Sequence, residues 1–129
     1  MGLDIVFSAR SKFDPRYCTE VGYFGKVNFI LTYFNIGDDK NCDIIEISHD
    51  QLHDFVNDLH KELMQHKANK TCNPINSNFK TKHVFFGGSV EYDNMYWEDM
   101  ESVYNWAKEL DTSPTFSWDK DKLEMFISW

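Results

Sequence analysis

The chain has few cysteines, and no two of them stand at the spacing of a metal site. Cys18, Cys42 and Cys72 lie far apart among 129 residues, and no Cys-x-x-Cys pair is present. This excludes a zinc site built from paired thiolates and predicts free thiols in a reducing compartment. The sequence also lacks a basic-then-apolar signal peptide and an apolar run long enough to span a membrane. We therefore expect a cytoplasmic protein with no membrane partner.

Positive charge is scarce as well. Lys and Arg number 13 against 21 Asp and Glu, so the formal net charge is −8. Binding to double-stranded nucleic acid needs clustered Lys and Arg at the phosphates, and this function is not expected. Between Lys61 and His83 the balance reverses, because five lysines stand against one acid, Glu62. This segment carries +4 and the rest of the chain −12, so one basic segment lies within an acidic body.

What the sequence does contain is sufficient for one folded domain over residues 1–129. It is 42% hydrophobic and 16% aromatic, and a chain of this length can bury a core without metals or disulfides. Ser48-His49-Asp50-Gln51 is a capping box that begins a helix, with an apolar face of Leu52, Phe55, Val56, Leu59 and Leu63. Periodicity predicts the other elements. They are strands over 2–8, 42–47 and 84–86, helices over 24–37 and 94–110, a flexible basic loop at about 67–82, and a closing hairpin of strands 115–118 and 123–129.

This order predicts an α+β fold. We expect a two-layer sandwich in which about three helices pack on a mainly antiparallel sheet of four to five strands. Long loops in small domains are commonly functional or disordered, which makes the 67–82 loop a segment of interest.

The segment Gly22–Lys26 is a candidate anion site. Two glycines, a lysine and the free amides of a helix start could hold a phosphate or a carboxylate. The spacing is not that of a P-loop, because Val27 stands where a Ser or Thr is required. The alternative interpretation is an ordinary tight turn.

A second candidate is the stretch from Val84 to Trp106, where an apolar run meets Gly87-Gly88 and a helix rich in aromatic residues begins. Its rings exceed what one helical face can bury, and exposed Tyr and Trp favour binding surfaces. Trp106 in particular is expected either at an interface or beneath the C-terminal hairpin. Core packing is the alternative for about half of these rings.

Two weaker patterns have simpler explanations. His49 and His53 lie four residues apart on one helix but lack a third metal ligand, so we expect solvated histidines and no metal. Asp93 and Glu98 could act as acid and base, yet acids in a first turn also stabilise the helix dipole. No Gly-x-Ser-x-Gly elbow is present, so an enzyme is not supported.

Several motifs spread over most of the chain resemble a family of small phage and prophage proteins. They are Met1-Gly2-Leu3-Asp4, Glu20-Val21-Gly22-Tyr23 with Lys26 and Asn28, Ser48 with Gln51-Leu52, Phe85-Phe86-Gly87, Ser89, Glu91-Tyr92-Asp93, Tyr96, Glu98-Asp99 and Ser128-Trp129. The resemblance implies a setting, the cytoplasm of an infected bacterium, more than a mechanism. Members usually read Gly-Tyr-Trp-Arg-Lys, with a histidine one turn later. Phe24, Gly25 and Leu31 replace the Trp, the Arg and that His here, which weakens an enzymatic interpretation.

Three hypotheses follow. The first is a phage-type binding protein, acting in counter-defence or host takeover, that holds a nucleotide-like or other anionic small molecule without turnover or cofactor. The second is an acidic protein–protein inhibitor that docks on a positively charged host protein. The third is a carboxylate-based hydrolase. A homo-oligomer is left open. The residues expected at the ligand are Tyr23, Lys26, Asn28, Ser89, Tyr92, Asp93, Tyr96 and Trp129.

Overall fold

The computed structural model describes residues 3–70, 72–80, 92–112 and 116–128. Four strands form one sheet in this part of the chain: β1 (Asp4–Ser11), β2 (Cys18–Gly25), β3 (Ile44–Ile47) and β4 (Asp121–Ser128). The helices are α1 (Asn28–Tyr33), α2 (His49–Asn69) and α3 (Asn94–Thr112), and two 3-10 turns are η1 (Asp38–Lys40) and η2 (Ser77–Phe79).

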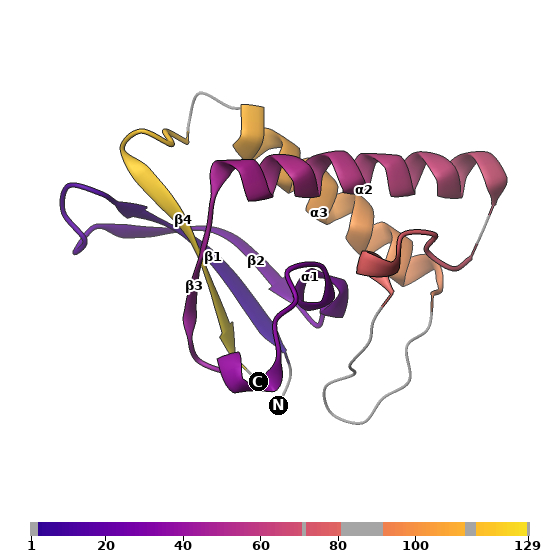
Figure 1. The fold of residues 1–129 in the computed structure, drawn as a ribbon, viewed down its shortest axis with the longest axis horizontal. Helices are drawn as coiled ribbons and strands as arrows, with labels where there is room; N and C mark the ends of the chain where they lie inside the picture. The colour runs from indigo at the N-terminus through magenta and orange to yellow at the C-terminus, as the bar shows by residue number, and fades with distance from the viewer. Residues whose placement is uncertain (1–2, 71, 81–91, 113–115, 129) are drawn as a thin grey trace.

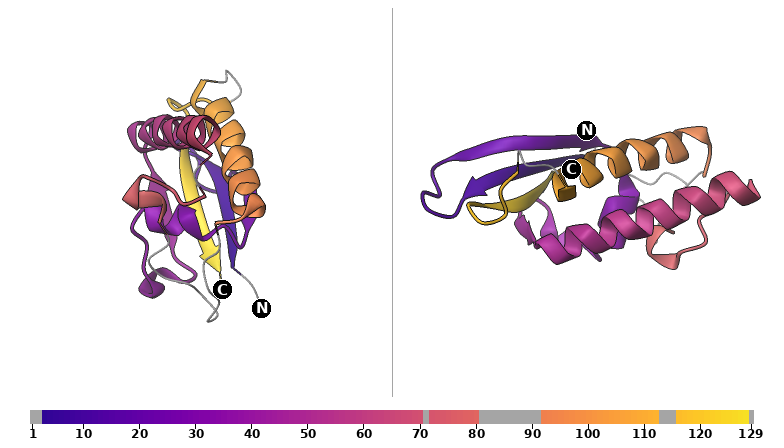
Figure 2. Two further views of the ribbon diagram at one scale, coloured as in Figure 1. Left: turned by 90° about the vertical axis from the view of Figure 1, so that its right-hand side faces the viewer. Right: turned by 90° about the horizontal axis from the view of Figure 1, so that it is seen from above.

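The sheet has the strand order β2-β1-β4-β3, and every pairing in it is antiparallel. The helices lie on one face of this sheet, with α2 running across the molecule and α3 beside it (Figures 1 and 2). The expected α+β sandwich is therefore confirmed, with three α-helices and four strands among the described residues.

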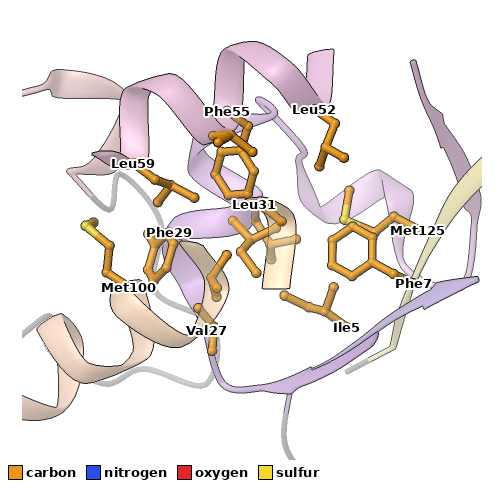
Figure 3. Close-up of a cluster of buried hydrophobic side chains, with 14 of the residues drawn as sticks. Ile5, Phe7, Val27, Phe29, Leu31, Leu52, Phe55, Leu59, Met100 and Met125 are labelled. Atoms are coloured by element: carbon orange, nitrogen blue, oxygen red, sulfur yellow. The ribbon is translucent and has the colours of Figure 1, made fainter. Parts of the chain in front are cut away.

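The core fills the space between the sheet and the helices. Inward side chains of β1 and β4, such as Ile5, Phe7 and Met125, meet Leu52 and Phe55 of α2 (Figure 3). The short helix α1 lies between them and contributes the fully buried Phe29, Ile30 and Leu31. All five apolar residues expected on the buried face of α2 are buried, which confirms the periodicity argument.

The capping box is also confirmed. The Ser48 hydroxyl accepts from the Gln51 amide at 3.1 Å, and the Gln51 side chain accepts from the Ser48 amide at 2.8 Å. These two bonds satisfy amides that have no partner inside the helix, and they fix where α2 begins.

The expected helix over 24–37 was wrong in its boundaries, and β2 was not expected at all. Phe24 is still in β2, opposite Ile5, and Lys26 adopts φ 62°, so the chain cannot become helical before Asn28. An edge strand that is mostly exposed lacks the apolar alternation by which a strand is recognised.

The prediction of a closing hairpin was also wrong. β4 pairs with β1 and β3, while residues 116–118 are not a strand and lead instead into a turn in which the Lys120 amide donates to the Ser117 carbonyl. The basic loop begins later than expected, since residues 67–69 complete α2. Thr115 and the expected strand over 84–86 lie outside the described residues.

The described part of that loop, residues 72–80, is anchored to the body. The Glu62 carboxylate is 2% exposed and accepts from the amides of Ile75 and Asn76, while Phe79 is fully buried. The Trp97 indole donates to the Cys72 carbonyl at 2.9 Å. A carboxylate with two amide donors is a strong attachment, because bonds to a charged acceptor are roughly twice as strong as neutral ones.

Candidate binding site

Six of the eight residues expected at a ligand are described by the structure, and these six do not gather at one place. Tyr23 pairs with Val6, so it lies on the sheet face opposite the buried Ile5 and Phe7. Its hydroxyl donates to the Asp4 carboxylate, and this bond raises the pKa of Tyr23. Lys26 is exposed, and its amide donates to the Leu3 carbonyl at 2.7 Å.

The residues at the start of α3 are explained by the fold. The Asp93 carboxylate accepts from the Tyr96 amide at 3.1 Å, which is the bond of a helix N-cap. The Tyr96 hydroxyl donates to the Phe79 carbonyl at 2.9 Å, and burial raises the pKa of Tyr96. Tyr92 packs edge-to-face on Tyr96, which in turn contacts Phe29 of α1. The ring of Tyr96 thus belongs to the hydrophobic core, and the ring of Tyr92 packs at its edge.

Asn28 is the first residue of α1, and its side-chain oxygen is buried without a hydrogen-bond partner among the described residues. The next residue, Phe29, contacts Tyr96 of α3. Ser89 and Trp129 lie outside the described residues.

Other acids of α3 bear on the hydrolase hypothesis. Asp99 is half-buried, and burial raises its pKa, with Glu98 and Asp93 adding to the effect. A raised pKa is a property of general acids, but it is also the ordinary result of burying a carboxyl group near like charges. Asp93, the partner that the hypothesis needs, is already used as a cap.

A cavity of about 470 Å³ lies elsewhere, between the β1–β2 side of the sheet and the C-terminal half of α3. Its volume is within the usual range of ligand sites. It combines three aromatic rings, two carboxylates, two aliphatic hydroxyls and an apolar floor. The lining residues are Ala9, Ser11, Tyr17, Thr19, Val21, Trp106, Glu109, Leu110, Phe116 and Asp121.

Trp106 is the fixed wall of this cavity. Its indole donates to the Val21 carbonyl at 2.8 Å, and its ring centroid lies 4.4 Å from that of Phe7 and 5.2 Å from that of Phe24. Trp106 therefore packs under β1 and β2 and not beneath a C-terminal hairpin, while the alternative of an interface residue stays a prediction. A ring held by a hydrogen bond and two aromatic neighbours gives the cavity a defined shape.

The polar groups of the cavity favour a cation. Among the described residues, the carboxylates of Glu109 and Asp121 are in no ion pair, whereas the Ser11 hydroxyl accepts from the amides of Phe13 and Asp14. The nearest basic side chain on β1, Arg10, is bound to Glu124 at 2.6 Å. Two unpaired carboxylates repel a phosphate and attract an ammonium or guanidinium group.

Two histidines of α2, His49 and His53, lie near the cavity, and the ring of Trp118 links them to its wall. His49 Nε2 lies 2.9 Å from one oxygen of Asp111, and His53 Nδ1 lies 2.8 Å from the other. His49 stacks on Trp118 at 4.4 Å, and Trp118 contacts Phe116, a wall of the cavity, at 4.6 Å. Both histidines are exposed, as expected, but they also share Asp111 as a hydrogen-bond partner.

The Asp111 side chain is only 7% exposed, and its hydrogen bond raises the pKa of His53. In the described part of the chain, no three His, Cys, Asp or Glu side chains are placed to hold one metal ion. The cluster of His49, His53 and Asp111 is a hydrogen-bonded joint between α2 and α3.

Comparisons of the chain with protein-family models, with curated proteins and with solved structures find no significant match. Among the described residues, no helix combines the length and the apolar character that a membrane crossing requires.

The cavity could not have been found from local motifs. Thr19 belongs to a strand that the sequence did not reveal, and Tyr17 directly precedes that strand. Glu109 lies in the last turns of α3 and Asp121 begins β4, without a recognisable spacing. One signal was available. Trp106 was singled out as a ring that the core face of its helix does not explain, and it is a wall of the cavity.

Proposed function

We propose that this chain is a non-catalytic protein-binding protein that contacts its partner through the tip of the β1–β2 hairpin. The hairpin tip, residues 12–17, joins the two strands at the left of Figure 1 and projects away from the helices. Phe13 is 80% exposed and Tyr17 is 69% exposed. This pair of exposed rings is the observation that carries the proposal, because aromatic side chains dominate the binding energy of protein interfaces.

The rings stand on a rigid support. The Ser11 hydroxyl accepts from the amides of Phe13 and Asp14, and the Tyr17 carbonyl accepts from the Ser11 amide at 3.0 Å. The Lys12 ammonium donates to the Trp118 carbonyl at 2.6 Å, tying the tip to the turn before β4. A loop that is already ordered loses less entropy on binding, which raises affinity.

Charge indicates what kind of partner is involved. Arg16 of the tip forms a two-pronged ion pair with Asp14, and the neighbouring Arg10 of β1 is bound to Glu124. The chain as a whole carries −8. A protein with a basic surface beside an apolar pocket complements this arrangement, and salt weakens the attraction between them.

The setting follows from the sequence resemblance to phage proteins. In that setting the partner is a host protein in the bacterial cytoplasm, and binding serves counter-defence or host takeover. The proposal is thus the protein–protein inhibitor hypothesis, with the hairpin tip as its contact surface.

The test is a comparison of four tagged forms in a bacterial lysate at low and at high salt. Wild type and Met64→Ala, which removes a side chain 56% exposed on α2, should retain the same protein. Phe13→Ala should lose it, with binding weakened by roughly tenfold or more when the captured protein is purified and titrated. Retention of every captured protein by Phe13→Ala and by Tyr17→Ala would refute the proposal.

The anionic small-molecule hypothesis keeps one supporting observation. The exposed Lys26 stands two residues from Asn28, whose buried side-chain oxygen has no partner among the described residues. Lys26 could meet the phosphate of such a ligand. A thermal-shift panel of nucleotides, including cyclic ones, tests this second proposal, which fails if none of them stabilises the protein.

A further inference from the structure

We propose that the cavity beneath Tyr17 is a binding site for a guanidinium group, and that its occupant is an arginine side chain of the partner protein. The inference rests on the proposed function, because Tyr17 belongs both to the hairpin tip and to the cavity lining. A partner that covers the tip therefore also covers the mouth of the cavity.

The first argument is charge. Glu109 reaches the cavity from α3 and Asp121 from the start of β4, so the two carboxylates come from separate elements. Neither is in an ion pair within the described part of the chain, and a guanidinium group can bind two carboxylates at once through its fork of N–H donors.

The second argument is the aromatic lining. Tyr17, Trp106 and Phe116 contribute rings from three different parts of the chain. Faces of such rings attract cations, and Arg stacks on them more often than Lys because its guanidinium group is planar and weakly hydrated. The combination of rings and carboxylates distinguishes this cavity from an ordinary apolar one.

The third argument is shape. Ala9, Val21 and Leu110 give the cavity an apolar floor that suits the methylene stem of a long side chain. A volume of about 470 Å³ exceeds that of one side chain, so residues flanking the arginine would enter as well. Thr19 adds a hydroxyl group to the lining. An anionic occupant is disfavoured, because it would bring a third negative charge beside Glu109 and Asp121.

The cavity can be tested without the unidentified partner. The probe is an acetylated, amidated tripeptide Ala-Arg-Ala, titrated into the purified chain while the indole N–H signal of Trp106 is followed by NMR. The signal should shift with a dissociation constant of about 1 mM, and raised salt should weaken binding. The same peptide with citrulline, which is neutral and nearly the same shape, should bind at least about tenfold more weakly.

Variants locate the interaction. Glu109→Gln and Asp121→Asn should each weaken the arginine peptide severalfold, and each substitution lies at a half-exposed or exposed position where the fold tolerates it. Glu98→Gln, an exposed acid on the same helix outside the cavity, should have no effect and is the matched control.

The outcomes separate the possibilities. Equal binding of the arginine and citrulline peptides, or no binding at about 10 mM peptide, overturns the inference. Spermidine binding more tightly than the peptide would overturn the assignment to a protein side chain and indicate a free polyamine. If Phe13→Ala abolishes partner binding while Glu109→Gln and Asp121→Asn leave it unchanged, the proposed function stands and this inference fails. If the peptide binds but no partner depends on Phe13, the cavity is a guanidinium site and the proposed function fails.

Discussion

Trp106 lies directly against Gly22. A Cβ atom built on Gly22 would be 2.6 Å from two atoms of the indole, a separation that real structures essentially never show. The glycine that sequence patterns associated with an anion site is therefore required for packing, because it lets α3 place its indole on β2. The same contact positions the wall of the cavity.

Gly22→Ala should lower the free energy of unfolding by about 2 kcal/mol, as overpacking does when the neighbour cannot move. The indole cannot easily retreat, since it is hydrogen-bonded to Val21 and packed on Phe7. Urea-induced unfolding measures the effect. The control is Gly25→Ala, whose new Cβ meets only the ring of Tyr23, at 3.4 Å or more, and should change stability by less than about 0.5 kcal/mol. Equal stability of the two variants would contradict the packing argument.

Glu62→Gln should lower stability by about 2 kcal/mol, because a neutral amide replaces a buried charged acceptor of two backbone N–H bonds. The amides of Ile75 and Asn76 should also lose protection from hydrogen exchange, since they are the groups released. Unfolding curves and exchange rates measured by NMR provide the two readouts. Glu101→Gln, on an exposed part of α3, should remain within about 0.5 kcal/mol of wild type. Unchanged exchange at Ile75 would show that the loop is held by other contacts.

Glu62 also shows what the sequence could and could not predict. It is the single acid in the basic segment from Lys61 to His83, which can be read directly from the sequence. Its period on α2 puts it beside the apolar face, but burial of a carboxylate depends on amides 13 and 14 residues away. No local pattern encodes that distance.

The helices and strands also divide into those that a local sequence pattern predicts and those that depend on distant contacts. The capping box at Ser48 and the apolar periods of α2 and α3 are local, and they predicted both helices and the buried face of α2. β2 is recognisable only through its pairing with β1, because an exposed edge strand has no face that must be apolar. The hairpin expected at residues 115–129 failed for a related reason. β4 joins the centre of the sheet, where its partners are set by the tertiary fold.

The joint between α2 and α3 should depend on pH. The hydrogen bond and charge of Asp111 raise the pKa of His53 above its ordinary value of 6.5, with Asp54 and Asp50 of α2 contributing. A group with a raised folded-state pKa stabilises the protein fully below its unfolded pKa, and this contribution is lost as pH rises through the folded pKa. His49 faces the same carboxylate.

Melting temperatures of wild type and Asp111→Asn, measured across neutral pH, check this. The advantage of wild type should be largest below pH 6.5 and should shrink above it, while NMR titration of His53 locates the upper limit of the change. His60→Gln, a substitution at an exposed histidine of the same helix, should leave the difference in place. A difference that is independent of pH would mean that the histidines are not charged partners of Asp111.

Asp93 distinguishes capping from chemistry. Its carboxylate accepts from the Tyr96 amide, so Asp93→Ala should lower stability by about 1 kcal/mol, the usual cost of a lost N-cap. Asp93→Asn should be nearly neutral, because asparagine caps helices as well as aspartate does. Chemical unfolding of the two variants beside wild type gives the comparison. A hydrolase that uses this carboxylate would behave differently, since Asp93→Asn would then abolish turnover while leaving the fold intact. Binding of the arginine peptide should be the same in both variants, because Asp93 is at the opposite end of α3 from Glu109.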